Sequence, residues 1–205
     1  TRVLTLNAMA QSFRFVDLPA QPVPSLLRGF SAPVILELEE DDARLAFRMA
    51  HDADPCNRWD AAQRYAERVV LALAADPDAQ VPAAYVQAMR TLLNAHSLDP
   101  AFRAQALALP GETYLLERMT PADPLALRAA LQRLMRTLGE QLAAEWLAVF
   151  DAMQVAGEYR YHPRDAGCRA LANLALRYLA AADDAQGLAR AQQRFDAATN
   201  MTERF

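Results

Sequence analysis

The chain has 205 residues, of which 53% are hydrophobic and 22% charged, the composition of an ordinary globular protein with a sizeable core. Its net charge is −4, and 21 basic residues are interspersed with 25 acidic ones. Proteins that bind a nucleic acid duplex usually carry a basic face, so nucleic acid is not expected as a partner. The longest apolar runs, such as residues 69–75, fall well short of the roughly 20 residues of a transmembrane helix, so no membrane association is expected.

The first forty residues alternate between apolar and polar side chains, the period of a half-buried strand. The alternation is clear in residues 12–17 and 34–39 and weaker in residues 3–6. A connector with prolines at 19, 22 and 24 separates the first clear segment from the second, and proline cannot donate a ladder hydrogen bond. These patterns predict three short strands, too few to close a sandwich or barrel.

From about Asp41 onward the apolar period is that of a helix. Asn57 is expected to cap the second helix, and Asp99 followed by Pro100 predicts another helix start. The strongest pattern follows residues 120–123 and predicts one helix of about seven turns. Its apolar positions are Leu127, Leu131, Leu134, Leu138, Leu142, Trp146, Val149 and Met153.

The predicted fold is therefore mainly α: a short N-terminal β-strand segment followed by a solenoid-like, superhelical stack of helices. The expected parts are residues 1–40, as the end of a β-sandwich domain, and residues 41–205, as part of a helical domain. No fixed sequence period is evident. Both ends resemble cuts, since the cap at Asn200 has no full helix behind it.

The sequence predicts no catalytic, cofactor-binding or metal-binding residue. His51, His96 and His162 have no second histidine or cysteine at ligand spacing, and no His-Glu-x-x-His motif occurs. Nucleophile-elbow and phosphate-binding glycine motifs are also absent. Cys56 and Cys168 lie far apart, which favours free thiols in a reducing cytosol. Since residues 1–4 lack signal-peptide features, a cytoplasmic location is expected.

Five weaker signals have a structural and a functional interpretation, and the structural one is favoured in each. Cys56 precedes a helix, where the dipole lowers a thiol pKa, but no partner base is evident. His162 is interpreted as a loop residue rather than a base, and His51 as a surface residue paired with acids. Arg58 and Trp59 offer a stacking surface, yet Trp59 lies on the apolar stripe and is expected in the core. The acidic pairs 39–42 and 183–184 are interpreted as helix starts.

Three stretches of the sequence are specific enough to compare with known families: residues 21–34, QPVPSLLRGFSAPV; residues 58–63, RWDAAQ; and residues 200–202, NMT. Together they resemble bacterial aminopeptidase N, a zinc-dependent family of peptidases. Their order agrees with the family, and the resemblance spans essentially the whole chain. It implies the end of a β-sandwich linker domain and part of the helical C-terminal domain.

The resemblance also implies a function. The parent enzyme removes N-terminal residues from peptides, and its zinc motif and transition-state tyrosine precede the matched region. The chain alone is therefore not expected to be an enzyme or to bind a cofactor; zinc belongs to the parent. Its expected role is to enclose and support the active site, with the catalytic domain and peptide substrates as partners. The alternative is a free-standing helical-repeat module that binds peptides or proteins. Uncovered apolar faces at Phe13 and Phe15 also predict self-association.

Overall fold

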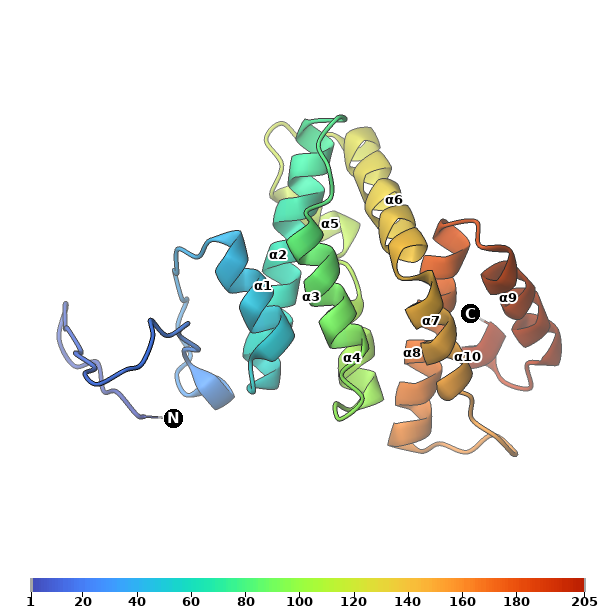
Figure 1. Cartoon of the computed structure of the whole chain (residues 1–205), viewed down its shortest axis with the longest axis horizontal. Coiled ribbons are helices and arrows are strands. Elements are labelled where there is room, and N and C mark those ends of the chain that lie inside the picture. The colour runs from blue at the N-terminus through green and yellow to red at the C-terminus, as the bar shows by residue number, and fades with distance from the viewer. Residues whose placement is uncertain (1, 205) are drawn as a thin grey trace.

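The computed structural model describes residues 2–204, and it is helical from Asp42 onward (Figure 1). The N-terminal segment holds only a short 3₁₀ turn, η1 (Arg28–Phe30). The helices that follow are α1 (Asp42–His51), α2 (Pro55–Ala75), α3 (Ala83–Leu93), α4 (Pro100–Leu107), α5 (Glu112–Glu117), α6 (Pro124–Gln141), α7 (Ala143–Ala152), α8 (Pro163–Ala181), α9 (Ala185–Ala197) and α10 (Met201–Arg204). The prediction of a mainly α, solenoid-like fold is confirmed.

The three predicted strands, at residues 3–6, 12–17 and 34–39, are wrong for this structure. No strand occurs within residues 2–204, and the segment before α1 is an extended chain. The physical reason is that a strand needs a neighbour to receive its backbone hydrogen bonds, and too few strand-forming residues are present to build a sheet. Phe13 and Phe15 are consequently 40% and 49% exposed.

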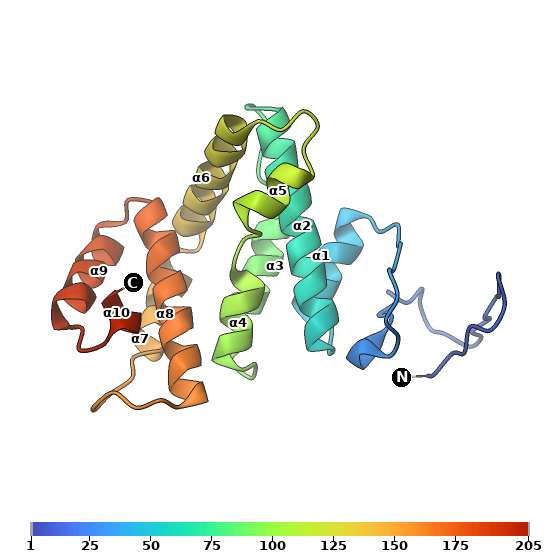
Figure 2. The same cartoon turned by 180° about the vertical axis from the view of Figure 1, so that it is seen from behind.

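The helices pack in two layers, which the opposite views of Figures 1 and 2 show from either side. One layer contains α1, α3 and α7, and the other contains α2, α4, α6 and α8. Within each layer neighbours contact one another: α1 packs on α3, α3 on α7, α2 on α4 and α6, and α8 on α4 and α6. Helices α9 and α10 pack on the outer end, against α8.

One continuous hydrophobic core runs between the layers. The apolar stripe predicted for the longest helix supplies much of it, because Leu127, Leu131, Leu134, Leu138, Leu142, Trp146 and Val149 are all buried. The predicted single helix is nevertheless divided: Leu142 has φ −121° and ψ 21°, which ends α6 and begins α7. Trp146 bridges the break by donating from Nε1 to the Leu138 carbonyl at 3.2 Å.

Two glycines allow α8 to approach its neighbours closely. A Cβ at Gly139 of α6 would lie 2.2 Å from the Tyr178 carbonyl oxygen, and one at Gly167 of α8 would lie 2.8 Å from the Ala101 backbone nitrogen in α4. Neither space admits a methyl group, so the spacing of α4, α6 and α8 depends on glycine at both positions.

A repeated motif opens α2 and α4. Asp54-Pro55-Cys56-Asn57-Arg58 and Asp99-Pro100-Ala101-Phe102-Arg103 share the pattern Asp-Pro-x-x-Arg, with the aspartates 45 residues apart (99 − 54). That spacing falls within the about 40–47 residues of HEAT and armadillo repeats. In both copies the aspartate side chain caps the helix and proline occupies its first turn.

The arginine of each copy reaches back to the end of the preceding helix. Arg58 donates to the carbonyls of Met49 and Ala50 in α1, and Arg103 donates to the carbonyl of Leu93 in α3. A cation at a helix C-terminus satisfies carbonyls that have no partner within the helix and complements its dipole. The expectation that Asn57 caps α2 is wrong because Asp54 holds that position. Within residues 2–204, no helix is long and apolar enough to cross a membrane.

Candidate functional site

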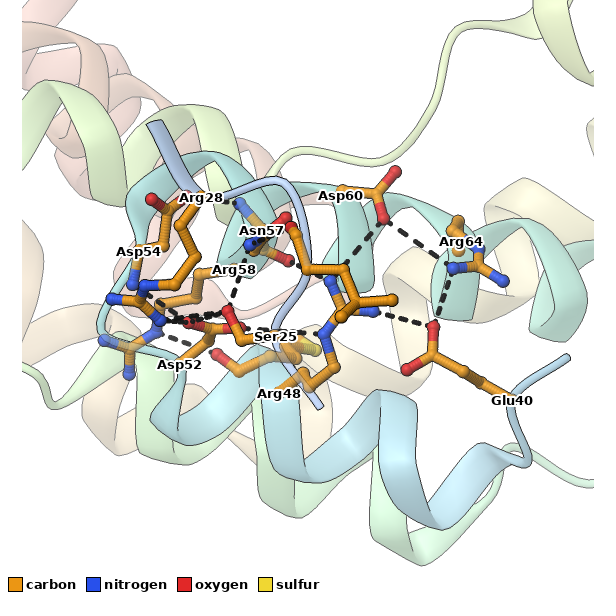
Figure 3. A network of polar contacts seen from close by, with 12 residues as sticks. Ser25, Arg28, Glu40, Arg48, Asp52, Asp54, Asn57, Arg58, Asp60 and Arg64 are labelled. Carbon is orange, nitrogen blue, oxygen red and sulfur yellow. Dashed lines mark hydrogen bonds and ion pairs between the residues drawn. The ribbon is translucent and has the colours of Figure 1, made fainter. Parts of the chain in front are cut away.

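A network of polar side chains joins the N-terminal segment to α1 and α2 (Figure 3). It brings together residues from the chain before α1, from α1, from the α1–α2 turn and from the first three turns of α2. Ten of its members are Ser25, Arg28, Glu40, Arg48, Asp52, Asp54, Asn57, Arg58, Asp60 and Arg64. We call this network the polar junction.

The start of α2 forms the first part of the polar junction. Asp54 accepts from the Asn57 backbone N–H through Oδ1 and from the Gly29 N–H through Oδ2, both at 3.0 Å. The Asn57 side chain donates from Nδ2 to the Leu26 carbonyl at 2.8 Å and to Ser25 Oγ at 3.0 Å. Thus the residues that begin α2 also fix η1 and the chain just before it.

Asp52, in the α1–α2 turn, lies at the centre of the polar junction. Its Oδ1 accepts from Ser25 Oγ and from Arg28 Nη1, both at 3.1 Å. Its Oδ2 lies 3.6 Å from Arg48 Nε. The Asp52 side chain is only 2% exposed, so this carboxylate binds the N-terminal segment from inside the fold.

Glu40 forms the third part, just before α1. Its Oε2 accepts from Arg48 Nη1 and from Arg64 Nη1, each at 2.7 Å. Arg64 also donates from Nη2 to the Leu38 carbonyl at 2.9 Å. The side chains of Glu40 and Arg48 are 0% and 4% exposed, so α1, α2 and the chain entering α1 share one buried ionic contact.

The polar junction is balanced in charge. It contains four carboxylates, at positions 40, 52, 54 and 60, and four guanidinium groups, at positions 28, 48, 58 and 64. Hydrogen bonding to the Asn57 backbone N–H, more than any other cause, lowers the pKa of Asp54, whereas desolvation raises the pKa of Asp60. Charges that neutralise one another leave little for a ligand, so this arrangement favours a positioning role over binding or catalysis.

The three histidines are dispersed. His51 ends α1 with its ring 5.1 Å from the Phe47 ring, while Asp52 beside it pairs with arginines instead. His96 lies in the α3–α4 turn, and His162 lies 3.8 Å from Asp165 at the start of α8. Within the part of the chain that is described, no three His, Cys, Asp or Glu side chains form a cluster able to hold a metal ion. The described residues therefore do not fit a zinc site.

Two other candidates are placed differently from expectation. Trp59 is 41% exposed, so its predicted core position is wrong: the buried face of α2 carries its neighbours Arg58, Ala61 and Ala62 instead. Trp59 lines an open groove with Leu36 and other residues of the N-terminal segment. Burial raises the pKa of Cys56, the opposite of activation by a helix dipole, and both cysteines are free.

Sequence reasoning missed most of the polar junction. Arg48, Asp52 and Arg58 are charged residues that are nearly or wholly buried, and a hydrophobic-period argument assigns such residues to the surface. One available signal was the second Asp-Pro-x-x-Arg motif, 45 residues after the first. It marks a helix-pair repeat and a structural arginine in each copy.

Comparison with known proteins places the chain in a class of helical repeats. Residues 42–205 match the family described as "Domain of unknown function (DUF3458_C) ARM repeats", and residues 1–39 match its companion, described as having an Ig-like fold. The chain belongs to this ARM-repeat family.

Its relatives are named aminopeptidase N. The chain is 36% identical to aminopeptidase N of Escherichia coli over 205 residues, which cover 98% of the chain and 23% of that protein. It is also 36% identical to aminopeptidase N of Caulobacter vibrioides, covering 99% of the chain and 24% of that protein. The predicted resemblance is confirmed, and the chain spans about a quarter of the length of these relatives.

A solved structure has the same fold. Aminopeptidase A of Legionella pneumophila, crystallised in complex with aspartic acid, matches with a TM-score of 0.78 and 25% sequence identity. The match covers 93% of this chain and 23% of that one. The fold described above thus occurs as one part of a much larger peptidase chain.

Proposed function

We propose that this chain is a non-catalytic C-terminal segment of a zinc metallo-aminopeptidase, and that it supports and encloses the active site of the parent enzyme. The observation that carries the proposal is the alignment of nearly the whole chain with a quarter of aminopeptidase N. The parent enzyme, in this proposal, removes N-terminal residues from peptides with zinc bound outside these residues.

The polar junction is evidence that this chain holds neighbouring parts of the parent enzyme in place. It connects the N-terminal segment, which matches an Ig-like family, to the first helices of the ARM-repeat region. The hydrogen bonds that join α2 and its N-cap to Leu26, Gly29 and Leu38 engage backbone atoms of these three residues, so they fix the direction in which the chain enters the helical stack. A fixed entry direction sets the orientation of the helical region toward whatever domain precedes it.

The test compares three proteins. The first is the product of the whole open reading frame, the second is the 205-residue chain alone, and the third is the whole product with Arg28→Ala and Asp52→Ala together. Each is assayed for hydrolysis of alanine p-nitroanilide and analysed for zinc. We expect zinc and hydrolysis in the first, neither in the second, and faster thermal inactivation in the third.

Two results would count against the proposal. One is a reading frame that encodes no peptidase segment, which would favour the free-standing helical-repeat module instead. The other is a whole protein whose heat inactivation is unchanged by the paired substitution, since the polar junction would then not support the active site.

A further inference from the structure

A groove follows the outer surface of α6 and α8, on the layer that contains α2 and α4. It consists of two adjoining hollows of about 310 and 660 Å³, within the range of known ligand pockets. Gln132, Met135 and Arg177 line both hollows. A third hollow between α8, α9 and α10 also includes Arg177. We call the first two hollows the α6–α8 groove.

The α6–α8 groove is positively charged although the chain as a whole is negative. Its lining contains four arginines, Arg128, Arg133, Arg136 and Arg177, and two acids, Glu112 and Asp183. The net charge of the chain is −4. Positive charge in a hollow attracts anionic ligands more strongly than the same charge on a flat surface, because low-dielectric walls focus the field.

Two of the four arginines have guanidinium groups without a partner among residues 2–204, whereas the other two are paired. Arg133 donates to the carbonyls of Leu73 and Pro77 at the end of α2, and Arg136 lies 3.7 Å from Asp183. Within residues 2–204, Arg128 and Arg177 have neither an ion pair nor a hydrogen bond from their guanidinium groups. Their helices provide no counter-ion either, because no acid occurs three or four residues before or after them.

The lining between these charges is apolar. Leu131, Met135 and Leu174 line the smaller hollow together with the turn at residues 108–111. Gly111, in that turn, has open space beside its Cα. A ligand that fits this surface combines carboxylates with apolar side chains, which is the chemistry of an acidic peptide rather than of a small inorganic anion.

We propose that the α6–α8 groove binds acidic peptide segments, with Arg128 and Arg177 pairing with aspartate or glutamate side chains. The proposal extends the proposed function, since it gives the parent peptidase a second contact that favours acidic peptides. Guanidinium groups suit this role because their planar donors bind a carboxylate through two parallel hydrogen bonds.

The test measures binding to the 205-residue chain and needs no turnover, so its failure leaves the proposed peptidase role intact. The probe is a short, amidated, fluorescein-labelled peptide in which glutamate alternates with leucine. A peptide with glutamine in place of glutamate is the matched control ligand. Amidation removes the terminal carboxylate, so binding reports the glutamate side chains. Fluorescence anisotropy gives the dissociation constants.

Arg177→Gln and Arg128→Gln should each weaken binding of the glutamate peptide about three- to fivefold, the range of an exposed ion pair. Arg164→Gln is the matched control variant. Arg164 is exposed and also lies on α8, and its substitution removes the same charge as Arg177→Gln does. It should change the dissociation constant less than about twofold, since distant charges are screened.

Three results would overturn the proposal. The glutamine peptide binding as tightly as the glutamate peptide would show that carboxylates are not recognised. Arg164→Gln weakening binding as much as Arg177→Gln would show a general charge effect. Displacement of the peptide by phosphate, at an ionic strength where chloride does not displace it, would assign the α6–α8 groove to inorganic anions.

Discussion

Glu40 and Arg48 form an ion pair with 2.7 Å between Oε2 and Nη1, and both side chains are almost entirely removed from water. Arg64 completes the contact from α2 at the same distance to the same oxygen. Glu40 lies outside any helix, so this pair fastens the chain that enters the helical stack to the stack itself.

Replacing Glu40 by alanine should lower the free energy of unfolding by about 3–5 kcal/mol, because it leaves Arg48 buried without its nearest counter-ion. Urea unfolding followed by circular dichroism at 222 nm measures this loss. Arg68→Ala is the control, since it removes one partner of an exposed pair with Asp42 and should cost about 1 kcal/mol or less. Equal losses in the two variants would refute the structural role of Glu40.

The repeated arginines provide a second prediction. Arg58→Met and Arg103→Met should each destabilise the chain by about 1–3 kcal/mol, since each leaves buried helix-end carbonyls without a donor. Arg177→Met on the exposed face of α8 should stay within about 0.5 kcal/mol. Hydrogen exchange should localise the Arg58→Met effect to the last turn of α1 and the Arg103→Met effect to that of α3. Uniform loss of protection would contradict the assignment to helix ends.

The sequence predicts the helical region well and the polar junction poorly, for a physical reason. Apolar periodicity reports burial against a core, which is why the stripe from Leu127 to Val149 is buried as expected. It reports nothing about charged residues that are buried because they pair with opposite charges, such as Glu40, Arg48 and Asp52. Alternation in residues 12–17 and 34–39 indicates strand propensity, but a strand also requires neighbouring strands.

Gly139→Ala should be destabilising, although alanine is favoured over glycine inside a helix by about 1 kcal/mol. The added methyl group would meet the Tyr178 carbonyl oxygen at 2.2 Å and the Ala182 Cβ at 2.8 Å. Forcing α6 and α8 apart should cost about 1–3 kcal/mol of net stability. Gly111→Ala, where the space is open, is the control for the chemical change. Thermal unfolding distinguishes the two, and a stabilised Gly139→Ala variant would show that the helices adjust freely.

Buried tyrosines make the chain sensitive to alkali. Burial raises the pKa values of Tyr85 and Tyr178, and to a smaller extent that of Tyr65. Tyr178 also donates from its hydroxyl to the Leu107 carbonyl at 2.8 Å. When the folded pKa exceeds the unfolded value of about 10, stability is complete below that pH and falls as the pH rises above it.

The free energy of unfolding should therefore fall above about pH 10, with a slope approaching 1.4 kcal/mol per pH unit for each buried tyrosine. No lysine is present to titrate in this range, which makes the slope easier to assign. Tyr178→Phe should reduce this slope by about the contribution of one buried tyrosine. Tyr161→Phe is the control, because Tyr161 is 87% exposed. An unchanged slope in Tyr178→Phe would contradict the contribution of this residue.

The N-terminal segment gives the last prediction, that the isolated chain self-associates. Phe13, Phe15, Val16 and Leu18 are each at least 40% exposed, and contiguous exposed apolar surface seeks a partner. Removing residues 2–20 should shift sedimentation toward the monomer without loss of helix.

Residues 21–40 must be retained, because Ser25, Arg28 and Glu40 belong to the polar junction and their loss would weaken the helical stack itself. Phe13→Ser combined with Phe15→Ser should reproduce the effect of the truncation. Ile35→Ser is the control, because Ile35 is also apolar and is 93% exposed but lies nearer α1, and it should have less effect. If the unaltered 205-residue chain sediments as a monomer at high concentration, the prediction is refuted.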